Sequence, residues 1–209
     1  MGNYYTEKEA LQDFYSYWEK IYPPLEDFHR NWLEKNAQIM RVKKGQVLYH
    51  SDDQQENLYI VLRGILIKER DITDSNRKQI LTVALPNLGF FTTMHYYSQS
   101  PALGDIIAIR PGIVLKIPYK KIKLDVDRDK GIDTLLQLLM NKKKYQLDHL
   151  RVMDALSLAT NRLFYLADNL PDIYHNLTQR ELSRLILASE SSVYRAKKIL
   201  VRRKPKKQR

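Results

Sequence analysis

The stretch that decides the fold lies near the C-terminus, where residues 177–200 read LTQRELSRLILASESSVYRAKKIL. Apolar residues recur at helical spacing in both halves of it: Leu182, Leu185 and Ile186, then Val193, Ala196 and Leu200. Thr178 and Glu181 form a capping-box pattern, and Ser189 is placed to cap a second helix. The stretch therefore predicts two short helices joined by a tight turn, the unit that lays its second helix in the major groove of DNA.

An ordinary helical hairpin has the same apolar pattern, but two observations favour a DNA-reading unit. The second predicted helix carries hydrogen-bonding side chains outside its apolar face, and the chain ends in the basic run VRRKPKKQR. The residues that we predict to bind DNA are Thr178, Gln179, Arg180, Ser189, Glu190, Ser191, Ser192, Tyr194, Arg195 and Lys198.

The positive charge of the chain is concentrated at the same end. The formal net charge is +11, and residues 195–209 contain nine Lys or Arg residues and no Asp or Glu. A membrane surface and the phosphates of a nucleic acid both attract such a cluster. Its position beside the predicted recognition helix favours the nucleic acid.

The composition excludes several classes of function. Because the chain has no cysteine, it cannot form disulfides, thiolate zinc sites, cysteine nucleophiles or cysteine-bound iron–sulfur clusters. No stretch approaches the ~20 apolar residues that a membrane span needs, and the N-terminus lacks the apolar segment of a secretory signal. We therefore expect a cytoplasmic protein. The sequence shows no paired carboxylates, nucleophile motif or phosphate-binding loop, so we expect no enzymatic activity.

The rest of the chain predicts an α+β protein. Residues 1–38 carry apolar and aromatic side chains at helical intervals, with Pro23 and Pro24 separating two helices. Between residues 40 and 118, short runs rich in Val, Ile, Leu and Tyr recur about every eight to twelve residues, which predicts an antiparallel barrel or sandwich. Residues 71–77 are expected to form an exposed hairpin loop. The joints between strands are assigned to Gly45, Gly64, Gly104 and Gly112.

A long helix is expected next, because apolar residues recur at three- and four-residue steps. We interpret it as a dimerisation helix; packing against its own barrel is the alternative. The residues assigned to the dimer seam are Ile132, Leu136, Leu139, Leu147, Leu150 and Met153. A further helix over 155–169 ends before Pro171. We therefore expect three parts. Residues 1–125 hold the first helices and the strands, residues 126–154 form the long helix, and residues 155–209 form the helix-turn-helix with its basic tail.

In their order and spacing these segments resemble the Crp/Fnr (catabolite-activator/fumarate-nitrate-regulator) superfamily of bacterial transcription regulators. The resemblance is carried by KKGQVLY at 43–49, NLYIVLRG at 57–64 and the stretch 177–200. It implies a β-roll of the cyclic-nucleotide-binding type, a connecting dimer helix and a helix-turn-helix. It also implies a homodimer bound to double-stranded DNA, with RNA polymerase as a further partner.

The ligand-binding cassette of that family is altered in this sequence. The family has Gly-Glu followed by Arg and a hydroxyl residue, whereas Thr92 with Thr93, and Leu103 with Gly104, stand at those places. Without the guanidinium the bidentate phosphate contact is lost, which argues against cyclic AMP as the effector. The effector stays unidentified, and no cofactor or metal is assigned. The pocket residues are assigned as Phe90, Phe91, Thr92, Thr93, Leu103 and Gly104, with Met94, Tyr96 and Tyr97 as further side chains that fill it.

Haem, another effector in the superfamily, finds little support. The five histidines have no mutual ligand spacing, and His95 is the one that we considered as a ligand.

The DNA-binding end departs from the family in two places. Leu187 stands in the turn where the family has Gly, and a leucine disfavours positive φ. Only nine residues follow Leu200 and Pro205 interrupts them, so we expect a basic tail on the phosphates in place of a full wing. We predict a sequence-specific DNA-binding regulator in which Arg195 can pair with guanine. The alternative is an effector- or protein-binding module with a degenerate helix-turn-helix.

Overall fold

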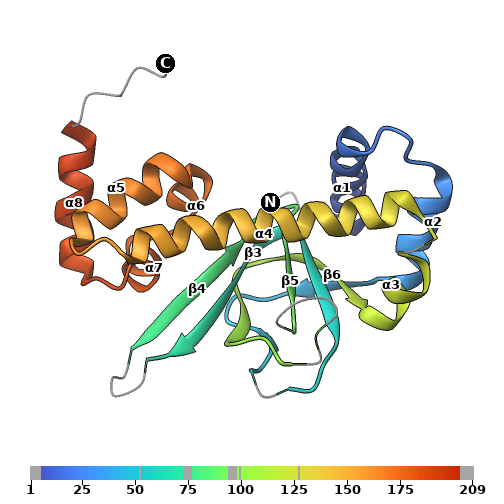
Figure 1. The fold of residues 1–209 in the computed structure, drawn as a ribbon, viewed down its shortest axis with the longest axis horizontal. Helices are drawn as coiled ribbons and strands as arrows, with labels where there is room; N and C mark the ends of the chain where they lie inside the picture. The colour runs from blue at the N-terminus through green and yellow to red at the C-terminus, as the bar shows by residue number, and fades with distance from the viewer. Residues whose placement is uncertain are drawn as a thin grey trace. The chain divides into compact units, whose positions relative to one another are not determined.

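The computed structural model describes residues 6–51, 53–72, 77–93, 98, 100–126 and 128–202 of the chain. They fall into two units. Unit 1 comprises Met1–Arg70 with Val83–Lys143, and unit 2 comprises Asp71–Thr82 with Lys144–Arg209. Figure 1 labels the helices and strands of both units. Within the described residues, no helix combines the length and the apolar character that a membrane crossing requires.

The two helices predicted at the start of the chain are confirmed. Helix α1 spans Glu7–Ile21 and helix α2 spans Asp27–Asn36, with the Pro-Pro pair between them. The Thr6 hydroxyl accepts a hydrogen bond from the backbone N–H of Glu9, whose carboxylate accepts one from the backbone N–H of Thr6. This capping box satisfies N–H groups that the first turn of a helix leaves without partners, and it fixes where α1 begins.

The strand-rich middle of the chain forms a six-stranded sheet, which confirms the α+β class. Its strands are β1 (Gln38–Val42), β2 (Val47–Tyr49), β3 (Asn57–Asp71), β4 (Lys78–Ala84), β5 (Gly89–Phe91) and β6 (Asp105–Pro118). Strand β6 pairs antiparallel with β1, β2 and β3, and β3 pairs in addition with β4 and β5. The two long strands β3 and β6 therefore hold the sheet together.

Two glycines lie inside the long strands, although the sequence predicted breaks there. Strand β3 runs through Gly64 and β6 runs through Gly112, and the register between the strands shifts beside both. A Cβ on Gly112 would lie 2.0 Å from the backbone oxygen of Arg63, and one on Gly64 would lie 2.8 Å from that of Pro111. Glycine is required at both positions because the backbones of β3 and β6 approach closely. The runs predicted as separate strands on either side of each glycine are therefore single strands, β3 and β6.

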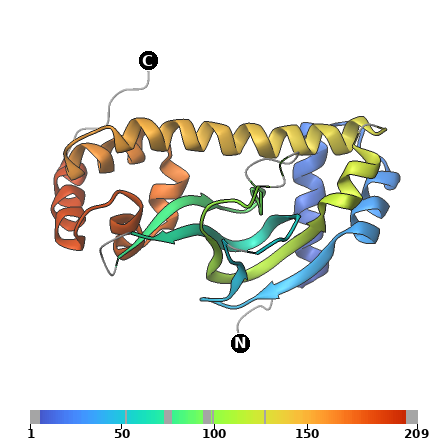
Figure 2. The same cartoon turned by 60° about the horizontal axis from the view of Figure 1, so that its bottom comes forward.

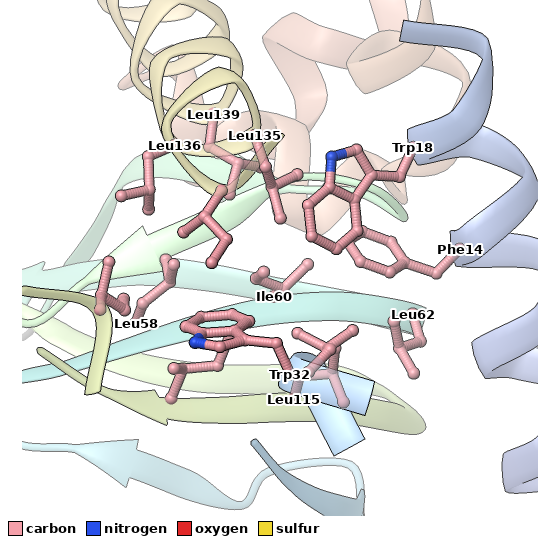
Figure 3. Packing of buried hydrophobic residues seen from close by; sticks show 14 of the residues in the cluster. Phe14, Trp18, Trp32, Leu58, Ile60, Leu62, Leu115, Leu135, Leu136 and Leu139 are labelled. Atoms are coloured by element: carbon pink, nitrogen blue, oxygen red, sulfur yellow. The ribbon is translucent and has the colours of Figure 1, made fainter. Parts of the chain in front are cut away.

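A hydrophobic core in unit 1 joins the sheet to the helices. Helix α4 spans Lys130–Asp154, and Figure 2 shows it as one continuous helix. In Figure 3, side chains from α1, β3 and α4 point toward one another, so the core is filled from several elements at once. The side chains labelled there are Phe14, Trp18, Trp32, Leu58, Ile60, Leu62, Leu115, Leu135, Leu136 and Leu139.

The residues assigned to a dimer seam on α4 are mostly buried within the chain itself. Ile132, Leu136, Leu139, Leu150 and Met153 are buried, and Leu147 is half-buried. A side chain buried in its own protomer cannot also form a seam with a second copy, so we correct the assignment for the five buried residues, and Leu147 stays a prediction. The helical period of these residues reflects packing inside the chain. Dimerisation itself, like the division of the chain at residues 125 and 154, stays a prediction.

The remaining helices are α3 (Tyr119–Asp125), α5 (Ala159–Asn169), α6 (Pro171–Asn176), α7 (Gln179–Leu185) and α8 (Glu190–Arg202). Helix α5 begins four residues later than predicted. The backbone N–H of Leu156 donates to the oxygen of Met153 in a turn that ends α4, and Arg162 Nε donates to the Leu156 oxygen at 2.6 Å. The arginine thus supports an irregular connection between α4 and α5.

Candidate nucleic-acid interface

The helix-turn-helix predicted from residues 177–200 is present as α7 and α8. The Thr178 hydroxyl accepts from the backbone N–H of Glu181 at 3.3 Å, and the Glu181 carboxylate accepts from the N–H of Thr178 at 2.8 Å. At the second helix, the Ser189 hydroxyl accepts from the N–H of Ser192 at 3.1 Å. Both predicted caps are therefore confirmed, and they fix the first turns of the two helices.

The apolar faces of both helices are buried inside unit 2. Relative exposure is at most 2% for Leu182, Leu185, Ile186, Val193 and Ala196. Because these residues face inward, the helical period of 3.6 turns the remaining side chains outward.

The turn between α7 and α8 is held in a strained conformation. Leu187 has φ +53°, a left-handed conformation that costs a residue with a Cβ about 1–2 kcal/mol. The backbone N–H of Ala188 donates to the oxygen of Ser183 at 2.9 Å. Arg162 Nη1 also donates to the Ile186 oxygen at 3.1 Å. These two hydrogen bonds hold the turn in place, and Arg162 is a positioning residue that the sequence reasoning missed.

The ten residues predicted to bind DNA lie at the outer ends and faces of α7 and α8. All are exposed except Gln179 and Ser192, which are half-buried. Gln179 Nε2 donates to the backbone oxygen of Glu190 at 3.1 Å, which joins the starts of the two helices. The Ser189 hydroxyl lies 2.9 Å from that of Ser191 and 2.8 Å from that of Ser192. A cluster of hydroxyl groups therefore surrounds the N-terminus of α8.

Farther along α8, an aromatic ring and a cation share the outward face. Tyr194 is 50% exposed, and Lys198 Nζ lies 4.5 Å from the centroid of its ring. Arg195 is exposed beside them, and its guanidinium has the geometry to donate two hydrogen bonds to guanine. The basic tail at 203–209 lies outside the described residues.

The residues assigned to an effector pocket have different surroundings, and their role in a pocket stays a prediction. Phe90 and Phe91 pack in two different core clusters, and Leu103 is 57% exposed. Thr93 Oγ1 donates to the hydroxyl of Tyr119 at 3.0 Å, and Thr92 Oγ1 accepts from the N–H of Asn57 at 2.9 Å. These two threonines satisfy buried polar groups. Met94, His95, Tyr96 and Tyr97 lie outside the described residues.

A small cavity reaches one member of that set. It has a volume of about 250 Å³ and is lined by Thr93, Pro101 and residues 53–56. This lining includes the carboxylates of Asp53 and Glu56 and no Lys or Arg. Glu56 is ion-paired with Lys123, whose Nζ lies 3.5 Å from Glu56 Oε2, and among the described lining residues no arginine is available to pair with a phosphate.

Lys68, on β3 in unit 1, is a buried cation that the sequence reasoning also missed. Its Nζ donates to the backbone oxygen of Phe91 at 2.7 Å, and the side chain is 5% exposed. Burial, with a smaller contribution from the charge of Lys143, lowers the pKa of Lys68 to about 7. The signal in the sequence is a lysine within the apolar run ILIKER.

The six-stranded sheet, called the β-roll from here on, precedes helix α4 and the C-terminal helix-turn-helix, and residues 39–124 match the model of the cyclic nucleotide-binding domain family. Comparison with curated protein sequences finds no match. FixK2 from Bradyrhizobium japonicum shares the fold, with a TM-score of 0.65 and 17% identity over 79% of this chain and 85% of that chain.

Two other solved structures have the same fold. A cyclic nucleotide-binding domain containing protein from Listeria monocytogenes has a TM-score of 0.67 and 14% identity over 93% of this chain and 91% of that chain. A CRP-family transcriptional regulator from Thermus thermophilus has a TM-score of 0.59 and 13% identity over 78% of this chain and 84% of that chain. The fold that the resemblance implied is therefore confirmed.

Proposed function

We propose that this protein is a sequence-specific DNA-binding transcription regulator whose recognition helix is α8. The observation that carries the proposal is the outward face of α8, where Arg195, Tyr194 and the capping hydroxyls are exposed together beside a buried apolar face. Recognition helices in helix-turn-helix proteins contact base edges with residues of their N-terminal part. The shared fold of known regulators supports the same function.

The side chains divide into two roles. Arg195 is placed to read a guanine in the major groove, since its guanidinium can donate to both O6 and N7. Thr178, Gln179 and Arg180, at the start of α7, are placed to contact phosphates, which set the register of the protein on the duplex. Glu190 can accept from the amino group of cytosine, although its charge repels nearby phosphates.

Dimerisation is part of the proposal, through a different face of α4 from the one first assigned. Tyr145 is 56% exposed and Val152 is 50% exposed, and both continue a seven-residue step that starts at the half-buried Leu138. These three residues occupy one of the two heptad positions at which paired helices carry apolar side chains. Two copies joined there would present two α8 helices to a pseudo-palindromic site.

The dimer face has its own test. We expect the Tyr145→Glu and Val152→Glu double variant to sediment as a monomer at concentrations where the wild-type protein is a dimer, because two carboxylates would face two others across the seam. Glu substitution at the exposed Gln137, which flanks the stripe, is the control and should leave the mass unchanged. A dimer that persists in the double variant refutes this face.

The effector side stays open, and cyclic AMP does not suit the described residues. The cavity beside Thr93 has carboxylate rather than cationic lining, and Leu103 stands exposed where the resemblance requires an arginine. We therefore propose a regulator that does not respond to cyclic AMP. Titration calorimetry with cyclic AMP should show no binding at millimolar nucleotide, and heat that saturates would contradict the proposal.

The deciding experiment is selection from a randomised duplex library at near-physiological salt. We expect a two-fold symmetric motif, and Arg195→Ala should cost about 1–3 kcal/mol of discrimination at one base pair in each half-site. Arg128→Ala, which removes an exposed arginine from unit 1, is the charge-matched control and should leave the motif unchanged. Recovery of no motif, with retention that disappears as salt rises, would favour a binding module with a degenerate helix-turn-helix.

A further inference from the structure

Unit 2 contains an open cleft that the recognition helix alone does not account for. Its volume is about 780 Å³. Helix α7 lines it with Arg180 and Arg184, and Arg77 and Lys78 line it from the beginning of β4. Four cationic side chains from two separate segments of the chain therefore border one space.

The other lining residues give the cleft a mixed surface. Ile72, Leu187 and Ala188 contribute apolar groups to the same lining as the cations, and Ser183 contributes a hydroxyl. Leu187 is 43% exposed in spite of its left-handed backbone. A ligand in the cleft can therefore reach the side chain of Leu187.

The cleft reaches the residues that begin α8. Ser189 and Glu190 line it, and Arg195 follows on the same helix. The carboxylate of Glu190 faces an anion unfavourably, but among the described lining residues four cations accompany this one carboxylate. Arg77, Lys78 and Arg180 are exposed, so a long polyanion can pass along the cleft.

We propose that this cleft holds the sugar–phosphate backbone of DNA, so that Arg77 and Lys78 supply phosphate contacts beside the recognition helix. The inference rests on the proposed function and adds a second contact surface to it. A DNA strand presents anionic phosphates together with the carbon-rich faces of its deoxyriboses, and the lining offers cations together with apolar side chains. The contacts carry no base information, and they take the place that a wing would have after α8.

The test is the salt dependence of DNA affinity in the Arg77→Ala, Lys78→Ala double variant. Each phosphate contact contributes about −0.9 to the slope of log K against log salt, so the slope should become shallower by about two. At near-physiological salt the affinity should fall about tenfold, equally for the selected duplex and for an unrelated one. The Arg77→Lys, Lys78→Arg variant keeps both charges and should retain the wild-type slope.

A matched control removes two cations elsewhere. Lys43 and Lys44 are exposed in the turn that precedes β2 and do not line the cleft. The Lys43→Ala, Lys44→Ala variant has the same net charge as the test variant, and it should change the affinity by less than about twofold. Equal slopes for the two alanine variants overturn the inference, because net charge alone would then explain the effect.

Two further measurements show whether the cleft binds a free phosphate ion or the DNA backbone. They also separate failure of the proposed cleft from failure of the proposed function. If calorimetry shows that wild-type protein binds inorganic phosphate and the double variant does not, while DNA affinity is unchanged, the cleft takes a free anion and the inference is wrong. If the double variant loses affinity and keeps the selected base motif, the inference is supported. If selection with wild-type protein returns no motif, the proposed function is contradicted. If the wild-type protein selects a motif but the double variant keeps the wild-type salt slope, only the role of the cleft is contradicted.

Discussion

The β-roll and the helix-turn-helix differ in the exposure of their notable side chains, which are buried in the roll and exposed in the helix-turn-helix. In the roll, Lys68 and Thr92 are buried and hydrogen-bonded, as is Tyr119 at the start of α3, all to neighbours within unit 1. In the helix-turn-helix, Arg195 and Leu187 are exposed. The polar groups of the roll therefore act on the stability of the fold, whereas those of the helix-turn-helix are available to a partner. Substitutions in the two regions should accordingly differ in what they change.

The largest effect on stability is expected at Gly112. A side chain there meets the backbone of β3, with the added carbon only 2.0 Å from the oxygen of Arg63, and backbone atoms cannot move aside without breaking the sheet. We expect Gly112→Ala to lower the free energy of unfolding by about 3 kcal/mol or more, measured by urea denaturation. Gly45→Ala meets no atom within 4 Å and should cost about 1 kcal/mol, from its φ of +83° alone. A similar loss of unfolding free energy in both variants would show that the backbones of β3 and β6 approach less closely at Gly112 than described.

An intermediate effect is expected from the charge of Lys68. In the unfolded chain the amine keeps its ordinary pKa of 10.5, whereas in the folded chain the pKa is about 7. The unfolded state therefore binds more protons between these two values, so the free energy of unfolding should rise as the pH increases from about 7 to 9.5. The rise should be on the order of 2 kcal/mol, and Lys68→Met should remove most of it.

Ionisation of the buried tyrosines cannot cause this rise in the free energy of unfolding, because it occurs at higher pH. Burial raises the pKa of Tyr59 to about 12, and unfolded tyrosine titrates near pH 10, so its ionisation lowers stability only above the window. Burial also lowers the pKa of Lys143, which acts in the same direction as Lys68. Denaturation midpoints measured at half-unit pH steps test the prediction, and an unchanged rise in Lys68→Met would assign it to another group.

The smallest effect is expected in the exposed turn of unit 2. Leu187→Gly removes the strain of a left-handed leucine, partly offset by the greater freedom of glycine in the unfolded chain, so a gain of about 0.5–1 kcal/mol is expected. The matched control is Asn87→Gly, because Asn87 has φ +64° and asparagine tolerates that region. Thermal melting should show a higher midpoint for Leu187→Gly than for Asn87→Gly. The reverse order would mean that the Leu187 side chain contributes packing.

The helix-turn-helix could be predicted because its signals are local. The Thr178 cap, the Ser189 cap and the 3.6-residue period each depend on residues within a few positions along the chain, and all three are found as predicted. Strand boundaries in the roll were harder to predict. The break predicted at Gly64 is absent because the role of this glycine depends on β6, which is distant in sequence.

The seam predicted on α4 and the pocket predicted in the sheet show the same limit of sequence patterns. An apolar period on a helix shows that one face is buried, but it does not show whether the burying surface belongs to the same chain. Leu136 and Leu139 turned out to pack in the core of unit 1. Likewise, Phe90 and Phe91 are neighbours in sequence but point into two different clusters, because successive residues of a strand face opposite sides of a sheet. The cationic cleft could not be predicted either, since its two lining segments are about 100 residues apart.

The close approach of the backbones of β3 and β6 at Gly64 and Gly112 limits how this sequence can vary. Where two side chains collide, a smaller residue at one position can make room for a larger one at the other. Here each glycine already lacks a side chain, and the atoms that an added carbon would meet belong to the opposing backbone. No second-site change of residue size can therefore rescue a substitution, so a saturation library should return glycine at both positions, each independently of the other. The two positions are thus fixed points around which the rest of the roll can diverge.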